Sequence, residues 1–156
     1  MGLAISLQEY LERCDVPYEV IEHQRATTML AAAHCAGVPE EKVAKAVLLE
    51  DEDGYMLALV PAACAVELGR LSKLLQRRIG LATESEVAEL FGDCETGAVP
   101  ALGTPYGIEV LIDDRLDGCD DLYFEGGDHR SLVHIRGRDL QRLLPEALHA
   151  RIGTAH

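Results

Sequence analysis

The segment V-A-K-A-V-L-L-E-D-E-D-G-Y-M-L-A-L-V-P, residues 43–61, decides the fold of this chain. It holds two apolar runs joined by Asp53-Gly54, a dipeptide that strongly indicates a tight β-hairpin turn. Both runs are apolar at successive positions, and therefore on both faces, as in strands that are covered above and below. The segment predicts a buried hairpin in the middle of a sheet.

Lys45 interrupts the apolar pattern of the first run. With a period of two, it lies on the same face as Val47 and Leu49, where an ammonium group loses hydration unless an anion or a carbonyl meets it. One interpretation is that the lysine lies at the end of the strand and extends its charge into water. The other is that it is a site lysine at the mouth of a pocket. The spacing alone favours the first interpretation and leaves the second open.

The chain has 156 residues, and we expect residues 1–156 to form one domain with a substantial core. It contains no run of 18 apolar residues, and its N-terminus does not show the pattern of a signal peptide. Its five cysteines include no C-x-x-C pair, which favours reduced thiols over disulfides or a zinc site. We therefore expect a cytoplasmic protein that does not enter a membrane.

The formal net charge of −13 argues against a broad nucleic-acid-binding surface, so an anionic partner would be held locally. The densest positive cluster lies on and just after a helix predicted at 67–76 and consists of Arg70, Lys73, Arg77 and Arg78. It is either an ordinary solvated helix face or a contact to a phosphate backbone. The six histidines lack metal-binding spacing, and we expect neither a metal nor another cofactor.

The remaining segments predict a mixture of helices and strands. Helices are expected at 7–15, after a capping box at Ser6, and at 28–36, 84–91 and 139–144. Strands are expected at 18–22, 79–82, 108–112, 121–125 and 131–136, with connectors at 62–65 and 93–107 and a fraying tail beyond Leu148. Because hairpins and consecutive strands predominate, the predicted fold is α/β of the α+β type, a curved mixed β-sheet surrounded by helices.

Four segments resemble the YbaK/ProX family of free-standing aminoacyl-tRNA deacylases, which are related to the editing insertion domain of bacterial prolyl-tRNA synthetases. They are K-A-V-L-L at 45–49, the stretch with Leu68, Leu71, Lys73 and Leu74, G-A-V-P-A-L-G at 97–103, and Y-F-E-G-G-D-H at 123–129. Each is weak alone, but their order and spacing are fairly specific. The resemblance covers about residues 18–144.

The resemblance implies metal-independent hydrolysis of the ester that joins a wrongly attached small amino acid (alanine, cysteine, serine or threonine) to the 3′ adenosine of tRNA. Lys45 is the expected catalytic residue, because the matching family lysine anchors the substrate. The other expected substrate-binding residues are Gly97, Ala98, Val99, Pro100 and Gly103 in the loop, His23 and Thr28 at the rim, and Gly127, Asp128 and His129 in the turn. For Asp128 and His129 a structural role in the turn is favoured over that of a general base. The attacking group is either water or the thiol of the substrate.

The resemblance implies the acceptor end of an aminoacyl-tRNA as the partner, with the four-residue positive cluster as its expected contact. The acidic net charge leaves a second source of tRNA affinity open, an aminoacyl-tRNA synthetase that holds the tRNA. The family's H-x-P segment reads His23-Gln24-Arg25 here, which leaves the amino acid specificity open. A non-catalytic binding module of the same fold and a small-molecule esterase are the competing hypotheses.

Overall fold

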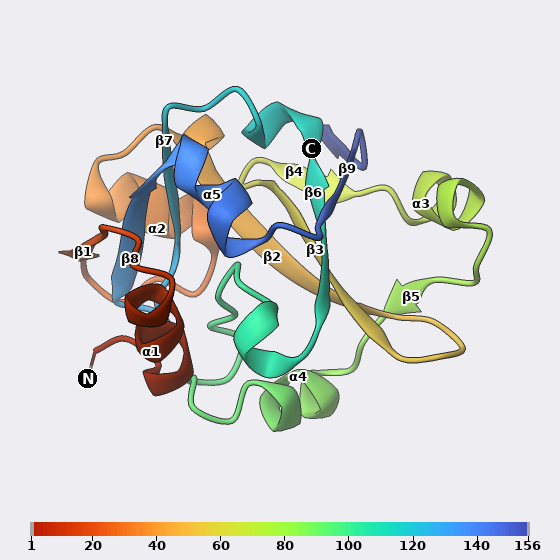
Figure 1. Ribbon diagram of the computed structural model, residues 1–156, viewed down its shortest axis with the longest axis horizontal. Helices are drawn as coiled ribbons and strands as arrows, with labels where there is room; N and C mark the ends of the chain where they lie inside the picture. Colours follow the sequence, from red (N-terminus) through yellow and green to blue (C-terminus); the bar gives the residue numbers. More distant parts are fainter. Residues whose placement is uncertain (1, 156) are drawn as a thin grey trace.

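A computed structural model describes residues 2–155 and shows a mixed sheet with helices around it (Figure 1). Seven strands follow one another across the main sheet, and β5 (Gly80–Leu81) adds to it by pairing with β2. Their order is β1 (Glu19–Glu22), β8 (Ser131–Arg136), β7 (Asp121–Glu125), β2 (Val43–Glu50), β3 (Tyr55–Pro61), β6 (Glu109–Asp113) and β9 (Leu148–Ala150). A second sheet pairs β4 (Cys64–Val66) with β10 (Gly153–Ala155). The predicted fold class is confirmed.

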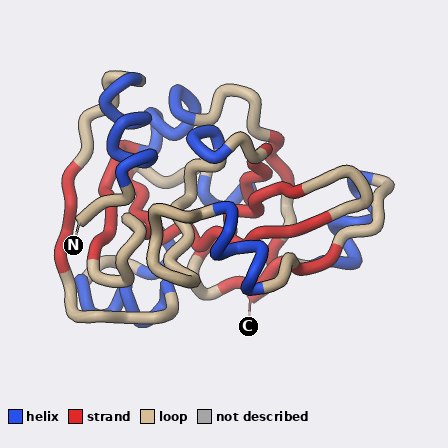
Figure 2. Tube along the Cα trace, turned by 90° about the horizontal axis from the view of Figure 1, so that it is seen from below, coloured by secondary structure: helices blue, strands red, loops and turns tan. Residues whose placement is uncertain are grey.

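The helices lie at the periphery of the strands (Figure 2). They are α1 (Ile5–Arg13), α2 (Met29–Ala36), α3 (Leu68–Leu75), α4 (Glu84–Leu90) and α5 (Gly137–Leu143). Short 3₁₀ turns cover Glu40–Lys42, Thr104–Tyr106 and Asp114–Leu116. No helix within residues 2–155 has the length and apolar character needed to cross a membrane.

The central hairpin forms as the sequence predicts. Strands β2 and β3 pair antiparallel from Ala44 opposite Pro61 to Glu50 opposite Tyr55. The carboxylate of Asp51 accepts hydrogen bonds from the backbone N–H groups of Asp53 and Gly54, at 2.8 and 2.9 Å. This side chain therefore fixes the turn together with the Asp-Gly dipeptide, because it satisfies two backbone donors that the tight turn leaves free.

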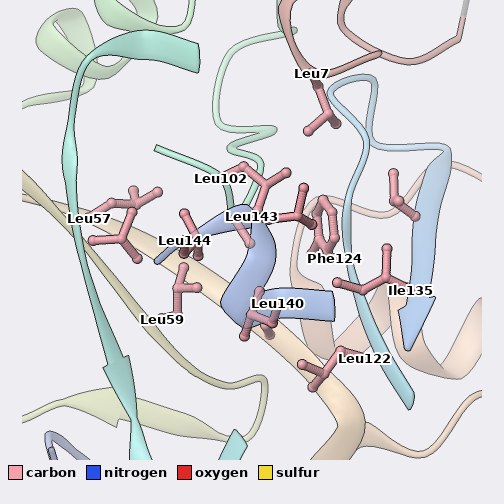
Figure 3. Close-up of a cluster of buried hydrophobic side chains, with 14 of the residues drawn as sticks. Leu7, Leu57, Leu59, Leu102, Leu122, Phe124, Ile135, Leu140, Leu143 and Leu144 are labelled. Atoms are coloured by element: carbon pink, nitrogen blue, oxygen red, sulfur yellow. The ribbon is translucent and has the colours of Figure 1, made fainter. Parts of the chain in front are cut away.

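The hairpin separates two parts of the core, one on each face. On one face Leu48 belongs to a cluster that includes Leu57, Leu102 and Phe124 (Figure 3). On the other face Leu49 packs with residues such as Leu71 of α3 and Ile152 near the C-terminus. Burial on both faces explains why β2 and β3 read as continuous apolar runs.

Two predictions for the chain ends are wrong. Helix α1 begins at Ile5 without a side-chain cap, and the N–H of Ser6 instead donates to the carboxylate of Asp93. The tail beyond Leu148 does not fray but forms β9 and β10. Its anchor is the buried carboxylate of Asp113, which accepts the N–H groups of Ile152 and Gly153 at 3.0 and 2.8 Å.

The sheet is interrupted along one edge of β2. This strand pairs with β7 only at Val43 and Ala44, and with β5 only at Leu49 and Glu50. In Figure 1, β2 runs away from β7 towards β5. Residues 45–48 therefore have a strand partner only on the β3 side, and the gap on the other side places the candidate site.

Candidate functional site

A cavity of about 670 Å³ opens beside this gap. It brings together the connector before α2, the middle of β2, the start of α4, the loop after α4 and the turn after β7. Its lining residues are 26–30, 45–48, Ala62, Leu81, Ala82, Glu84, Val87, Thr96, Gly97, Val99, Glu125 and His129. The predicted site residues Lys45, Thr28, Gly97, Val99 and His129 all lie on this one wall, although they are far apart in the sequence.

Lys45 carries the positive charge of the cavity wall. Its side chain is partly buried, and this burial lowers the pKa of its ammonium group below the usual 10.5. Within residues 2–155 no carboxylate forms an ion pair with it. An ammonium that has lost hydration without gaining a protein anion is well placed to bind an anionic ligand group. The place of Lys45 on the cavity wall favours a site lysine over a strand-end lysine extended into water, and its catalytic role stays a prediction.

Glu125 organises the turn that closes the cavity behind Lys45. Glu125 is 2% exposed, and its Oε2 accepts the backbone N–H groups of Gly127, Asp128 and His129 at 2.8, 3.3 and 3.2 Å. Burial raises the pKa of this carboxyl group. Gly127 and His129 both have positive φ, at 121° and 61°. Glu125 was not predicted as a site residue, although it directly precedes the glycine turn that starts at Gly126.

His129 connects three segments of the wall. Its Nε2 lies 2.8 Å from the carbonyl oxygen of Thr96, and because a carbonyl only accepts, Nε2 carries the proton. The backbone carbonyl of His129 accepts the N–H of Ala26 at 2.9 Å. Gly97, with φ of 83°, lies over the imidazole ring, since a Cβ added there would be 3.8 Å from its Cε1. His129 therefore holds the loop and the connector in place around the cavity.

Both carboxylate oxygens of Asp128 accept hydrogen bonds within the turn. Its Oδ1 accepts the N–H of Arg130 at 2.9 Å and its Oδ2 accepts the hydroxyl of Ser131 at 3.2 Å. The carboxylate is buried and does not line the cavity. This geometry supports the structural role in the turn rather than that of a general base. Gly127 is also buried and away from the cavity wall.

His23 lies next to the cavity without lining it. Its Nδ1 is 2.6 Å from the carbonyl oxygen of Gln24, and its backbone N–H donates to Arg130. The following Arg25, which stands where the family has proline, pairs with Glu95 at 3.1 Å. This ion pair joins the connector to the loop after α4. The Arg25–Glu95 contact is invisible in the sequence because 70 residues separate its partners.

Only two of the five predicted loop residues line the cavity. Ala98, Pro100 and Gly103 are buried behind Gly97 and Val99 and do not reach the wall. A Cβ added at Gly103 would lie 2.5 Å from the backbone oxygen of Ile108, so glycine is needed there for close packing of two backbone segments. These three residues lie behind the cavity wall, and their contact with the substrate stays a prediction.

We expect Gly103→Ala to lower the free energy of unfolding by about 1–3 kcal/mol, because the added methyl group meets backbone that cannot move aside. Urea unfolding would measure this, with Gly69→Ala on α3 as the control, since nothing lies within 4 Å of a Cβ there. Unchanged stability combined with weaker substrate binding would contradict a purely structural role for Gly103.

The start of α2 forms another part of the wall. The hydroxyl of Thr28 accepts the N–H of Ala31 at 3.1 Å and caps the helix. Thr28 also lines the cavity, so the N-terminal end of this helix faces it. The apolar lining residues Met29, Leu30, Leu81 and Val87 were not predicted, because their pattern is that of ordinary core or surface positions.

The predicted tRNA-binding cluster lies apart from this wall. Arg70, Lys73 and Arg78 are exposed on and after α3, whereas Arg77 pairs with Asp51 in the hairpin turn at 3.0 Å. None of the four lines the cavity. Figure 1 shows α3 beside the hairpin tip, at the opposite end of the molecule from α2. Their role in tRNA binding stays a prediction.

Cys94 is not poised as a nucleophile. Cys94 precedes the cavity loop, and burial raises the pKa of its thiol to about 12, so it stays protonated at neutral pH. Among residues 2–155 no group of three or more histidine, cysteine or acidic side chains is placed to hold a metal ion. The wall offers the Lys45 ammonium, which can stabilise negative charge, beside glycine and apolar lining residues.

The sequence profile of the family described as the aminoacyl-tRNA editing domain matches residues 23–143. The chain belongs to this family. The matched range begins at the connector and ends in α5, so it contains every segment of the cavity wall. Among curated proteins none matches the chain.

Several solved structures have a fold similar to that of this chain. A protein provisionally described as a trans-editing enzyme for prolyl tRNA synthetase is 27% identical, has a TM-score of 0.83 and covers 97% of each chain. A scaffold protein used to present linear epitopes is 25% identical with a TM-score of 0.84, over 98% of this chain and 97% of that one. A hypothetical protein at 22% identity and a TM-score of 0.85, covering 96% of this chain and 99% of the other, shows the fold alone.

Proposed function

We propose that this aminoacyl-tRNA editing domain is a trans-editing hydrolase that cleaves the ester of a mischarged aminoacyl-tRNA carrying a small amino acid. The observation that carries the proposal is the partly buried Lys45 ammonium, without an ion-pair partner among residues 2–155, on the wall of a cavity with glycine and apolar lining. A cavity of about 670 Å³ is in the usual range for small-molecule sites. The reaction takes place in the cytoplasm, where charged tRNA is found.

Hydrolysis of an aminoacyl ester requires little of the protein beyond positioning of the substrate. An aminoacyl ester is already activated, so the enzyme needs to hold it and to stabilise the oxyanion that develops on attack. The Lys45 ammonium suits both this role and binding of the terminal phosphate, and the N-terminal end of α2 adds partial positive charge at the cavity. We propose that no metal takes part. The attacking group is water or, for cysteine, the thiol of the substrate.

Incubating the protein with tRNAs charged with alanine, serine, threonine or cysteine tests the proposal. We expect at least one of them to lose its amino acid much faster than in buffer alone, in the presence of a chelator as well as without it. Free aminoacyl esters are the control, and preferential hydrolysis of these would instead indicate a small-molecule esterase. Binding of tRNA without hydrolysis of any ester would indicate a binding module.

We propose that the exposed residues Arg70 and Lys73 contribute weak, salt-sensitive contacts to the tRNA. The double variant Arg70→Glu, Lys73→Glu should raise KM for full-length mischarged tRNA by roughly tenfold at low salt and leave hydrolysis of a short acceptor-end analogue unchanged. The charge-matched control is Arg138→Glu, Arg151→Glu, at two other exposed positions. Equal KM values for the double variant and the unaltered protein would show a merely solvated helix face, with a synthetase as the remaining source of tRNA affinity.

A further inference from the structure

The interrupted edge of β2 presents backbone groups to the cavity. The carbonyl of Val43 accepts the N–H of Ala62 on the β3 side, whereas the carbonyl of Leu48 accepts the N–H of Ala82 on the opposite side. Along a strand the N–H and C=O of successive residues point alternately to the two edges. Ala46 therefore shares the edge of Leu48, which faces the gap.

Three of these backbone groups have no hydrogen-bond partner within residues 2–155. The pairing with β7 ends at Ala44 opposite Phe124, and the pairing with β5 begins at Leu49 opposite Leu81. The N–H and C=O of Ala46 and the N–H of Leu48 lie between these limits, and no bond to them is formed. Both residues line the cavity. Since unpaired backbone groups away from bulk water are costly, a ligand that satisfies them gains binding energy.

The spacing of these groups selects a class of ligand. The C=O of Ala46 accepts and the N–H of Leu48 donates, and the two lie side by side on one strand edge. The free stretch covers only residues 45–48, between the end of the pairing with β7 and the start of the pairing with β5. It suits a small flat molecule that carries a donor and an acceptor next to each other on one edge.

Apolar side chains from both faces of the sheet flank this edge. Met29 of α2 packs in the cluster with Val43, on the face of β2 that also carries Lys45. Val87 and Val99 pack against the cluster that holds Ala44 and Leu48, on the other face. All three line the cavity. A flat ligand lying in the plane of the sheet would therefore have apolar cover above and below.

We propose that this strand edge binds the 3′-terminal adenine of the substrate, with N6–H donating to the carbonyl of Ala46 and N1 accepting the N–H of Leu48. Adenine is flat and presents a donor and an acceptor side by side, which complements the strand edge. The inference takes the identity of the ligand from the proposed function, whereas the hydrogen-bonding geometry comes from the free edge of β2. Base recognition then comes from the backbone, so no side chain in the sequence indicates it.

The test uses amide analogues, in which an amide replaces the labile ester, and follows backbone amide signals by NMR. Addition of 3′-alanylamino-3′-deoxyadenosine should shift the Leu48 amide and slow its hydrogen exchange, while the Val47 amide, which faces β3, changes little. The inosine counterpart places a donor against the N–H of Leu48 and an acceptor against the carbonyl of Ala46. We expect it to bind at least about tenfold more weakly.

Equal binding of the adenosine and inosine analogues would overturn the proposal. The propionyl analogue, which lacks the α-amino group, gives a second test. If binding is lost with this analogue but not with the change of base, the aminoacyl end occupies the strand edge and the proposal is overturned. Hydrolysis of mischarged tRNA ending in inosine separates the two proposals. Unchanged hydrolysis would overturn the adenine contact and support the editing function. Base-selective binding of the analogues without hydrolysis of any mischarged tRNA would support the adenine contact and overturn the editing function.

Discussion

The variant Lys45→Ala is expected to lower kcat/KM for deacylation of mischarged tRNA by at least about 100-fold, which is the usual effect of removing one group that stabilises an oxyanion. The reason is that Lys45 is the cation on the cavity wall and has no ion-pair partner among residues 2–155. Single-turnover assays over a range of protein concentrations, from below saturation to saturation, would measure the change. Circular dichroism and thermal unfolding would show that the fold is retained.

Two further readouts separate this role from a structural one. Lys45→Met keeps the volume of the side chain and removes a poorly hydrated charge, so it should unfold at the same or higher urea concentration while being equally inactive. In the unaltered protein, activity that needs the charged ammonium should fall as the pH rises through a pKa below 10.5. Retained activity in Lys45→Met would show that the ammonium has no part in the reaction.

The variant Glu125→Ala is expected to lower the free energy of unfolding by about 3–5 kcal/mol, because it leaves three buried backbone donors without an acceptor. Since this turn holds His129 under Gly97, the variant should also lose activity at temperatures where it is still folded. Urea unfolding and single-turnover deacylation would measure the two effects.

Matched variants sharpen this prediction. Glu125→Gln keeps one acceptor oxygen and should lose clearly less stability than Glu125→Ala. Glu109→Ala, at an exposed position in β6, should change stability by less than about 0.5 kcal/mol. A Glu125→Ala protein as stable as the Glu109→Ala control would show that the turn does not depend on this carboxylate.

The sequence predicts the central hairpin and most of the strands, because these depend on local apolar patterns and turn residues. The helix expected at 84–91 also forms, and Thr83 and Glu86 make a capping box at its start. The β10 strand could not be predicted, because it exists only through pairing with β4 and through the distant Asp113 carboxylate. Ser6 fails as a cap for a similar reason, since the nearby Asp93 takes its backbone N–H.

The candidate site likewise contains residues that the sequence predicts and residues that it does not. Lys45 and the glycine-rich segments can be found in the sequence, because a lone cation in an apolar strand and clustered glycines are unusual. The sequence does not indicate which loop residues face the cavity. Gly103 and Gly97 look alike in the sequence, and only the structure shows that Gly103 packs against the backbone of Ile108. The apolar wall at Leu81 and Val87, and the free edge of β2, arise from where neighbouring strands end. No local pattern encodes that.

The most direct measurement of the central claim is an NMR titration of the Lys45 side-chain nitrogen, with and without a 5′-phosphorylated 3′-alanylamino-3′-deoxyadenosine. A partly buried, unpaired ammonium that binds the substrate should have a pKa below 10.5 in the free protein, and a higher pKa once the bound phosphate supplies the missing anion. A pKa at the ordinary value, unmoved by the analogue, would contradict the account and show Lys45 to be a solvated strand-end lysine.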